Sequence, residues 1–573
     1  MLTIRYGFVA GFLQAPGRSD MPSFHRGTSC LGVRNLRSNR SFLIILVVVL
    51  ALIALWSQGA WAQDATGAGV QSGVPLDGPL EDRVLHNEAA LNIAFLVLGA
   101  ILVLFMQSGF AMLEVGLARA KNASHVALQN FTIFGLSSVA YFAVGYGLQF
   151  SAVAVPLLGY NEAIGTIFPS RDFGLFGTSG FFLVGAYQPG VLGFFLFQTA
   201  FMDTTATIPT GSMAERWRFK SFIWWGLFCG ALYFPLYGAW VWGGGWLSTL
   251  GVNFGLGNGV VDFAGAGVVH GMGGMAALTG AVVLGARRGK YTPSGRARAL
   301  PGHNVPLSLL GAFILLVGWF GFNAASTFAA SDLRFAVVAA NTAIAASAGM
   351  VAALVTAYAR LDKPDPGYIA NGMLGALVAV TGSCAFVAPW AAFVIGASAG
   401  VIVIFSMLVV ERVLKIDDPA GAISVHAVCG LLGVLAVGIF ADGTYGAGYN
   451  GVDSAVVGIL YDGSRGTSQL AAQAIACAVI IVWGGGFSYA FFRIQHSLSS
   501  IRSTPQDEIA GLDVEEIGVL GYAEFALLAE AAVVGADGED EAGREAAERR
   551  WDSRPPPYDG QPQDQDQEWQ WRP

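Results

Sequence analysis

From residue 90 onward the chain carries eleven apolar stretches, each long enough to cross the ~30 Å core of a bilayer as a helix. They lie near residues 90–113, 126–149, 188–213, 221–242, 262–286, 304–326, 333–359, 368–386, 389–411, 419–441 and 468–493. Hydrophobic residues make up 54% of the chain and charged residues only 12%, too few to cover a soluble globule. We therefore predict an all-α membrane protein with eleven transmembrane helices.

The basic residues of the loops predict how these helices are oriented. The first, third, fifth, seventh and ninth loops contain 14 Lys and Arg residues, whereas the alternate loops contain only Arg171, Arg334 and Arg465. Because Lys and Arg favour cytoplasmic loops, we expect a multi-pass cell-membrane protein with its N-terminus outside and its C-terminus in the cytoplasm. The net charge of −8 argues against a nucleic-acid partner.

The N-terminal residues have the pattern of a targeting segment. Six arginines precede an apolar run at 42–56, and Ala60-Trp61-Ala62 matches a signal-peptidase site, so the mature chain would begin at Gln63. An uncleaved additional helix is the alternative, and Met21 is an alternative start.

The rest of the chain then divides into four regions. We expect an extracellular segment at 63–89, an eleven-helix domain at 90–495, a cytoplasmic segment at 496–534 and a tail at 535–573, after a leader at 1–62. The tail is rich in Asp, Glu, Pro and Gln, and this composition predicts disorder.

Two histidines within apolar stretches mark an internal repeat. Segments 262–274 and 418–430 are identical at seven of thirteen positions, and each has an Asp eight residues before its His: Asp262 before His270, and Asp418 before His426. The segments lie five stretches apart, so we predict a five-plus-five inverted repeat with an extra C-terminal helix. Eight helical residues rise about 12 Å, so both histidines reach the membrane midplane, where they could touch.

The two histidines are the strongest functional signal in the chain. An ionisable side chain within a bilayer is costly and usually lines a pathway, although each ring could instead bond a neighbouring helix. The five cysteines form no CxxC pair, and no nucleophile–base set, metal cluster or phosphate loop is visible. We therefore expect a pore rather than an enzyme, without a cofactor or metal.

Further motifs resemble the ammonium transporter family (Amt/Mep/Rh) over about residues 90–525. They are GFAMLEVGLARAKN at 109–122, FQTAF at 197–201, MAERWRF at 213–219, WGGG at 242–245 and GWFGFNAAS at 318–326, together with the two Asp–His segments. The resemblance implies a homotrimer in which each subunit has its own narrow pore for ammonium or ammonia. It also implies that a PII-type signal protein could bind the cytoplasmic face.

The resemblance assigns an outer recruitment site to Trp242 and Ser326, together with Phe201. A cation could bind the indole face by a cation–π interaction, and the hydroxyl could accept a hydrogen bond from it. Trp242 also ends an apolar stretch, where an interfacial aromatic residue is common. Asp262 matches the acidic residue below this site; it could act electrostatically, cap its helix, or do both.

The resemblance assigns the gate and the centre of the pore to further residues. Phe201 and Phe322 match the two rings that close the outer end, and Phe197 lies one helical turn from Phe201. His270 and His426 match the paired pore histidines. For Asp418 we favour helix capping.

Three positions depart from the family pattern. Asp203 stands where small residues are more frequent; it could bind a cation, but we favour bonds to Thr or backbone groups. Gly421 replaces a common Asp, and Glu114 stands where some relatives have Tyr.

Three functions are compatible with these patterns. The leading hypothesis is a transporter that binds ammonium outside, deprotonates it and passes ammonia through a His-lined apolar pore. An ammonium sensor that signals to a cytoplasmic partner is the alternative. A Rh-like gas channel is the third, although Trp242 and Ser326 favour a charged substrate.

Overall fold

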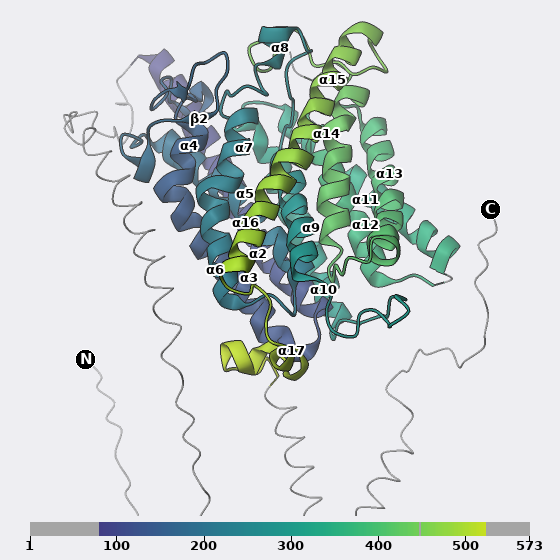
Figure 1. The fold of residues 1–573 in the computed structure, drawn as a ribbon. Helices are drawn as coiled ribbons and strands as arrows, with labels where there is room; N and C mark the ends of the chain where they lie inside the picture. Colours follow the sequence, from purple (N-terminus) through teal and green to yellow (C-terminus); the bar gives the residue numbers. More distant parts are fainter. Residues whose placement is uncertain (1–78, 362, 446–447, 523–573) are drawn as a thin grey trace, which may run out of the picture. The chain divides into compact units, whose positions relative to one another are not determined.

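The computed structural model describes residues 79–361, 363–445 and 448–522 (Figure 1). The predicted leader at 1–62 and the predicted tail at 535–573 lie outside these residues. Of the segment predicted at 63–89, only residues 79–89 are described.

Eleven helical segments follow one another within the described residues, and ten of them are long and apolar enough to cross a membrane. The ten are Leu80–Leu117 (α2), Ala120–Phe150 (η3, α3, η4 and α4), Pro189–Met213 (α5), Phe219–Val241 (α6, η7 and α7), Ala266–Leu284 (η8 and α9), Val305–Thr327 (α10 and η9), Arg334–Leu361 (α11), Pro389–Val413 (α13 and η10), Ile423–Phe440 (η11 and α14) and Gly463–Leu498 (α15, η12 and α16). The eleventh is the shorter apolar helix α12 (Pro366–Thr381). The predicted all-α membrane fold is confirmed.

Short elements occupy the connections between these segments and the chain after the last one. They are η5 (Pro156–Leu158), η6 (Phe181–Leu183), α8 (Leu250–Phe254), α17 (Pro505–Ala510), η13 (Asp513–Ile517), and an antiparallel pair of two-residue strands, β1 (Ile167–Phe168) and β2 (Phe176–Gly177).

Two helix boundaries differ from the sequence prediction for identifiable reasons. α2 begins at Leu80, ten residues before the predicted start of the apolar stretch. The residues that follow Leu80 are largely polar, so a search for apolar stretches omits them, but they can still form a helix in water. α12 ends at Thr381 rather than near 386. There the backbone carbonyls of Thr381 and Gly382 accept hydrogen bonds from Ala264 and Phe263, so another segment satisfies the end of the helix.

The two repeat segments pack against each other reciprocally. η8 (Ala266–Gly271) leads into α9 (Met272–Leu284), and η11 (Ile423–Val428) leads into α14 (Cys429–Phe440). η8 packs against α14 while α9 packs against η11, and the two π-helical starts also touch. This exchange is what an inverted repeat with its site at the repeat interface requires.

The chain after α16 lies across one end of the helices, which we call the C-terminal face; α17 marks it in Figure 1. Lys121 Nζ donates to the carbonyl of Glu508 at 2.9 Å, and Ser503 N donates to the carbonyl of Arg216 at 3.0 Å. The carboxylate of Asp513 accepts from the backbone N–H groups of Ser124 and His125 at 3.1 and 2.8 Å. This last contact caps the first turn of α3 (Ala123–Ala140) with a side chain from the other end of the chain.

Candidate functional site

Each repeat segment begins with a carboxylate that binds the following backbone. Asp262 accepts three backbone N–H bonds of 2.9–3.1 Å, and Asp418 accepts two of 2.8 and 3.0 Å. Three residues after each Asp the chain turns through a glycine with positive φ, 102° at Gly265 and 76° at Gly421. An L side chain adopts this conformation only at a cost, so Gly265 and Gly421 both have a backbone role in these turns.

These turns bring the two histidine rings together. His270 Nδ1 and His426 Nδ1 lie 3.1 Å apart, with the ring centroids at 5.2 Å and the ring planes inclined by 22°. A hydrogen bond at this distance needs one ring to donate and the other to accept, so a single proton lies between the two Nδ1 atoms. Both side chains are buried.

Two glycines allow this close approach. Gly274 and Gly430 each lie four residues after a histidine. A side chain at Gly274 would collide with the backbone of Ala427, and one at Gly430 would collide with the backbone of Ala266. The repeat segments therefore cross almost backbone to backbone.

A row of stacked rings leads away from His270. Its ring centroid lies 5.4 Å from that of Phe322, and Phe322 stacks on Phe201 at 4.1 Å with an interplanar angle of 21°. Phe201 then meets Phe197 at 4.6 Å and Trp242 at 6.1 Å. The structure thus joins the ring residues singled out by the resemblance, and Phe197, Phe201 and Phe322 are almost completely buried.

Trp242 and Ser326 have their own hydrogen-bond donors occupied. Trp242 follows α7 (Phe234–Val241), and its Nε1 donates to the backbone carbonyl of Asp262 at 2.7 Å. Ser326 Oγ donates to the carbonyl of Phe322 at 2.8 Å. The indole face and the serine lone pairs therefore remain as acceptors of positive charge.

A small cavity of about 20 Å³ lies on the other side of the histidine pair. His426, Phe110 and Glu114 are among its lining residues. One probe sphere of water needs about 10–15 Å³, so the cavity is large enough for one molecule of the size of water.

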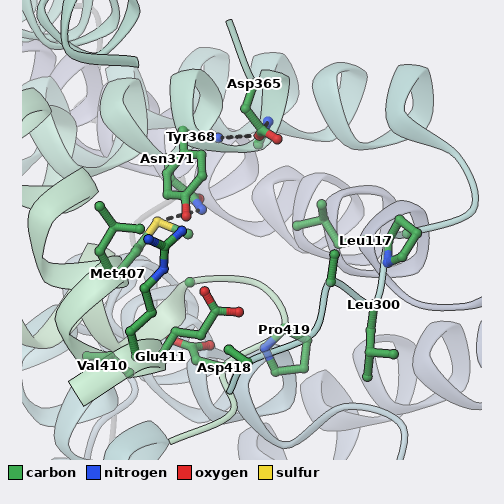
Figure 2. A pocket seen from close by; sticks show the side chains of 18 of the residues that line it. Leu117, Leu300, Asp365, Tyr368, Asn371, Met407, Val410, Glu411, Asp418 and Pro419 are labelled. Atoms are coloured by element: carbon green, nitrogen blue, oxygen red, sulfur yellow. Dashed lines mark hydrogen bonds between the residues drawn. The ribbon is translucent and has the colours of Figure 1, made fainter. Parts of the chain in front are cut away.

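A much larger pocket of about 1600 Å³ opens at the C-terminal face, and Figure 2 shows part of its lining. Leu113 and Asn371 line both the small cavity and this pocket. The small cavity and the pocket are therefore neighbours, with these two side chains between them.

Two of the buried carboxylates are held by neighbouring side chains. Glu114 accepts from Asn130 Nδ2 at 2.7 Å and from Thr210 Oγ1 at 2.8 Å. Asp203 accepts from Ser137 Oγ at 3.4 Å, so its observed partner is a serine of the preceding segment rather than a threonine.

Trp319 is a site residue that sequence reasoning missed. Its ring stacks on His270 with the centroids 5.1 Å apart and the planes at 18°, and its Nε1 donates to Thr381 Oγ1 at 2.9 Å. Trp319 lies in the GWFGFNAAS motif, one helical turn before Phe322, and this spacing could have indicated a shared helix face.

A contiguous row of rings and imidazoles between the halves of an inverted repeat defines a multi-pass membrane protein of the channel or transporter class. Residues 94–522 match the model of the Ammonium Transporter Family. The chain belongs to this family.

Three similar proteins illustrate the relationship. Ammonium transporter Amt2 of Archaeoglobus fulgidus is 41% identical over 444 residues, which cover 77% of this chain and 90% of that protein. A solved structure named Sensor Amt Protein is 35% identical with a TM-score of 0.66, covering 75% of this chain and 99% of the other. Mep2 of Saccharomyces cerevisiae shares the fold at a TM-score of 0.61 and 23% identity, covering 73% of this chain and 88% of the other.

Proposed function

We propose that this chain transports ammonium by binding it as a cation and passing it inward as ammonia. Its membership of a transporter family, rather than of an enzyme family, supports this function. The observation that carries the mechanism is the His270–His426 contact at 3.1 Å, in line with the stacked phenylalanines.

Recruitment takes place at Trp242 and Ser326. The indole face attracts a cation by about 0.5–2 kcal/mol, and the serine oxygen accepts one N–H bond. Ammonium can donate that bond and potassium cannot, so the hydroxyl favours ammonium between ions of similar size.

Phe201 and Phe322 form an apolar gate. A hydrated cation would have to shed its shell among these rings without replacement partners, at a high cost in free energy. Ammonia is neutral and crosses the same rings cheaply, so the gate separates it from its proton.

The histidine pair then serves both species. Each neutral ring offers a donor or an acceptor, so the pair can bind ammonia or relay a proton. The small cavity beyond His426 receives the molecule before it enters the pocket at the C-terminal face.

The test is the current in proteoliposomes after an ammonium pulse, with methylammonium and potassium as comparison ions. We expect His270→Leu and His426→Leu each to abolish the current, because each change removes one half of the relay. His86→Ala is the matched control, since it deletes an exposed imidazole outside the row and should keep full current. Wild-type current in both leucine variants would contradict the mechanism.

The 35% identity to a protein named Sensor Amt Protein makes an ammonium sensor the second candidate. A pure sensor would bind ammonium and pass none, so the absence of any flux in the proteoliposome assay would favour it. Flux of ammonia alone, without current, would instead favour a Rh-like gas channel.

We further propose the arrangement of the chain in the cell. The mature chain starts at Gln63 outside, the segment 63–89 is extracellular, and the C-terminal face is cytoplasmic, as the 14-to-3 division of loop cations supports. The family resemblance supports a homotrimer, with the C-terminal face available to a PII-type signal protein.

A further inference from the structure

Glu114 places a carboxylate among the helices that the proposed transport steps do not use. It lies on α2, one turn after Phe110, and is 4% exposed. Its oxygens accept hydrogen bonds from two neutral side chains, Asn130 on α3 and Thr210 on α5. Among the described residues, no Lys, Arg or His lies within ion-pair distance of it. The carboxylate is therefore held in position without a positive partner.

Glu114 also lines the small cavity together with His426. These two residues carry the only ionisable side chains among the described residues that line it. The aromatic rings of Phe110 and Trp319 belong to the same lining. Since the cavity of about 20 Å³ admits one molecule of the size of water, a molecule that leaves the histidine pair lies next to the carboxylate.

A buried carboxylate without a positive partner is costly unless a proton or a cation neutralises it. The proposed pathway delivers both to this cavity, because the histidine pair passes protons and ammonia. A protonated carboxyl with ammonia has a total charge of zero, and so does a carboxylate with ammonium. Proton transfer between them therefore creates no net charge in the cavity, and the rings of Phe110 and Trp319 favour the cation.

The lining offers acceptors for the N–H groups of an ammonium ion. A carboxylate has about four acceptor positions, and the three bonds from Asn130 and Thr210 leave one of them for a ligand. Asn371 supplies a second acceptor, because its Nδ2 donates to the carbonyl of Ala420 at 3.0 Å and its Oδ1 remains to accept. Asn371 also lines the large pocket (Figure 2), so the site is next to the exit at the C-terminal face.

We propose that Glu114 makes the small cavity an inner binding site for ammonium, where ammonia regains its proton. The inference rests on the proposed function and extends it, because it names the residue at which the two separated species recombine. The inner site complements the recruitment site at Trp242 and Ser326. Each combines an oxygen acceptor with an aromatic ring, which is the chemistry that selects a small cation with N–H donors.

The recombination step conserves atoms and charge. The O–H bond of the Glu114 carboxyl breaks and a new N–H bond forms on ammonia, so that ammonium lies beside a carboxylate. The ammonium ion then leaves for the large pocket. The next proton, passed on by His426, restores the carboxyl before another ammonia molecule arrives.

The first test observes the carboxyl group by infrared difference spectroscopy of the full chain in proteoliposomes at constant pH. We expect added ammonium to weaken the C=O band of a protonated carboxyl and to strengthen the carboxylate bands. Neither change should occur in Glu114→Gln. Potassium is the comparison ion, because it carries no proton and should leave the parent spectrum unchanged. The same response to potassium, or to ammonium in Glu114→Gln, would overturn the proposal.

The second test measures the ammonium current of matched variants. Glu114→Gln keeps the length of the side chain and should lower the current about tenfold or more, because a hydrogen bond between charged groups is lost. Glu114→Asp retains a carboxylate and should recover part of the current. Asp203→Asn is the control, since it removes a buried carboxylate of α5 that does not line the cavity, and it should keep the parent current. Parent current in Glu114→Gln, or an equal loss in Asp203→Asn, would contradict the inference.

A variant that fills the cavity completes the test and replaces Glu114→Gln if that variant does not fold. Ala422→Val keeps the carboxylate but narrows the cavity that Ala422 lines, so the infrared response to ammonium should be lost. An unchanged response would place the responding carboxyl elsewhere and overturn the proposal. If the parent chain shows the infrared response but no current, the proposed function fails while the binding site stands. If it carries current without the response, transport stands and the site fails.

Discussion

The charged residues buried at the C-terminal face form a network of ion pairs and hydrogen bonds. Arg287 binds Glu215 Oε1 at 2.5 Å and Asp417 Oδ2 at 2.8 Å, and Arg216 donates to the backbone carbonyl of Asp417 at 2.8 Å. Burial raises the pKa of Asp417, but Arg216 and Arg287 lower it more, so the net pKa lies well below its usual value. The pKa of Glu215 is lowered in the same way, with Arg287 and Arg119 outweighing burial.

These depressed values predict how stability depends on pH. A carboxyl whose pKa is lower in the folded state stabilises the protein above its unfolded pKa of about 4, and this contribution is lost as pH falls below that value. Asp417→Asn leaves Arg287 short of a partner and should cost about 3–5 kcal/mol at pH 7, with a weaker acid dependence than the parent chain. Thermal unfolding followed by tryptophan fluorescence at pH 7 and at pH 3.5 measures both effects.

The exposed carboxylate of Asp365 provides the control for this prediction. It caps α12 without a basic partner within ion-pair distance among the described residues, so Asp365→Asn should change stability much less. Equal melting temperatures for the Asp417 variant and the parent at pH 7 would show that the network is not stabilising.

At the scale of elements, the crossing of the two repeat segments decides the geometry of the site. The segments approach closely because Gly274 and Gly430 have no side chains at the contact. The helix of each repeat segment begins with a π-helical turn, η8 or η11. This turn changes the direction in which the histidine side chain points, compared with a regular α-helix. The contact between His270 and His426 therefore depends on how the two repeat segments pack against each other.

A methyl group at this crossing should separate the histidines. We expect Gly430→Ala to cost about 1–3 kcal/mol by overpacking and to reduce ammonium current. Gly135→Ala on α3 is the matched control: nothing lies within 4 Å of its added Cβ, so helix propensity alone should leave it neutral or slightly stabilised. Unfolding and current are measured on the same preparations, and full current in Gly430→Ala would argue against a tight crossing.

At the scale of the whole molecule, the two ends of the helices differ in the residues and segments that lie there. The C-terminal face carries the ion network, the large pocket and the segment that ends at Tyr522. α8 lies at the opposite end of the helices (Figure 1). This asymmetry has a direct consequence for the topology in the membrane.

The proposed orientation can be tested with a membrane-impermeant maleimide. Val252→Cys on α8, 60% exposed in the structure, should react in intact cells, and Ala299→Cys on the C-terminal face should react only after permeabilisation. The parent chain reports the background, because its cysteines in the described residues are buried. The reverse labelling pattern would mean that the chain is inserted the other way round.

The sequence by itself was enough to predict the helical segments, the candidate pore histidines and the family of this protein. The apolar stretches predicted the eleven helical segments, because a bilayer leaves a spanning backbone few alternatives to a helix. The equal spacing of Asp262 from His270 and of Asp418 from His426 predicted that the two rings could touch. The expected rise of about 12 Å over eight helical residues was wrong, because each segment turns at Gly265 or Gly421 before its helix begins. The residues quoted for the family resemblance lie within the family match at 94–522.

Tertiary structure alone decided the contacts that make a site of these residues. His270 and His426 are 156 positions apart, and their 3.1 Å separation depends on how two segments cross. The stacking of Trp319 on His270 and the bond between Ser137 and Asp203 are likewise contacts between distant segments. Residue spacing specifies the face of a helix, but close packing in three dimensions selects which faces meet.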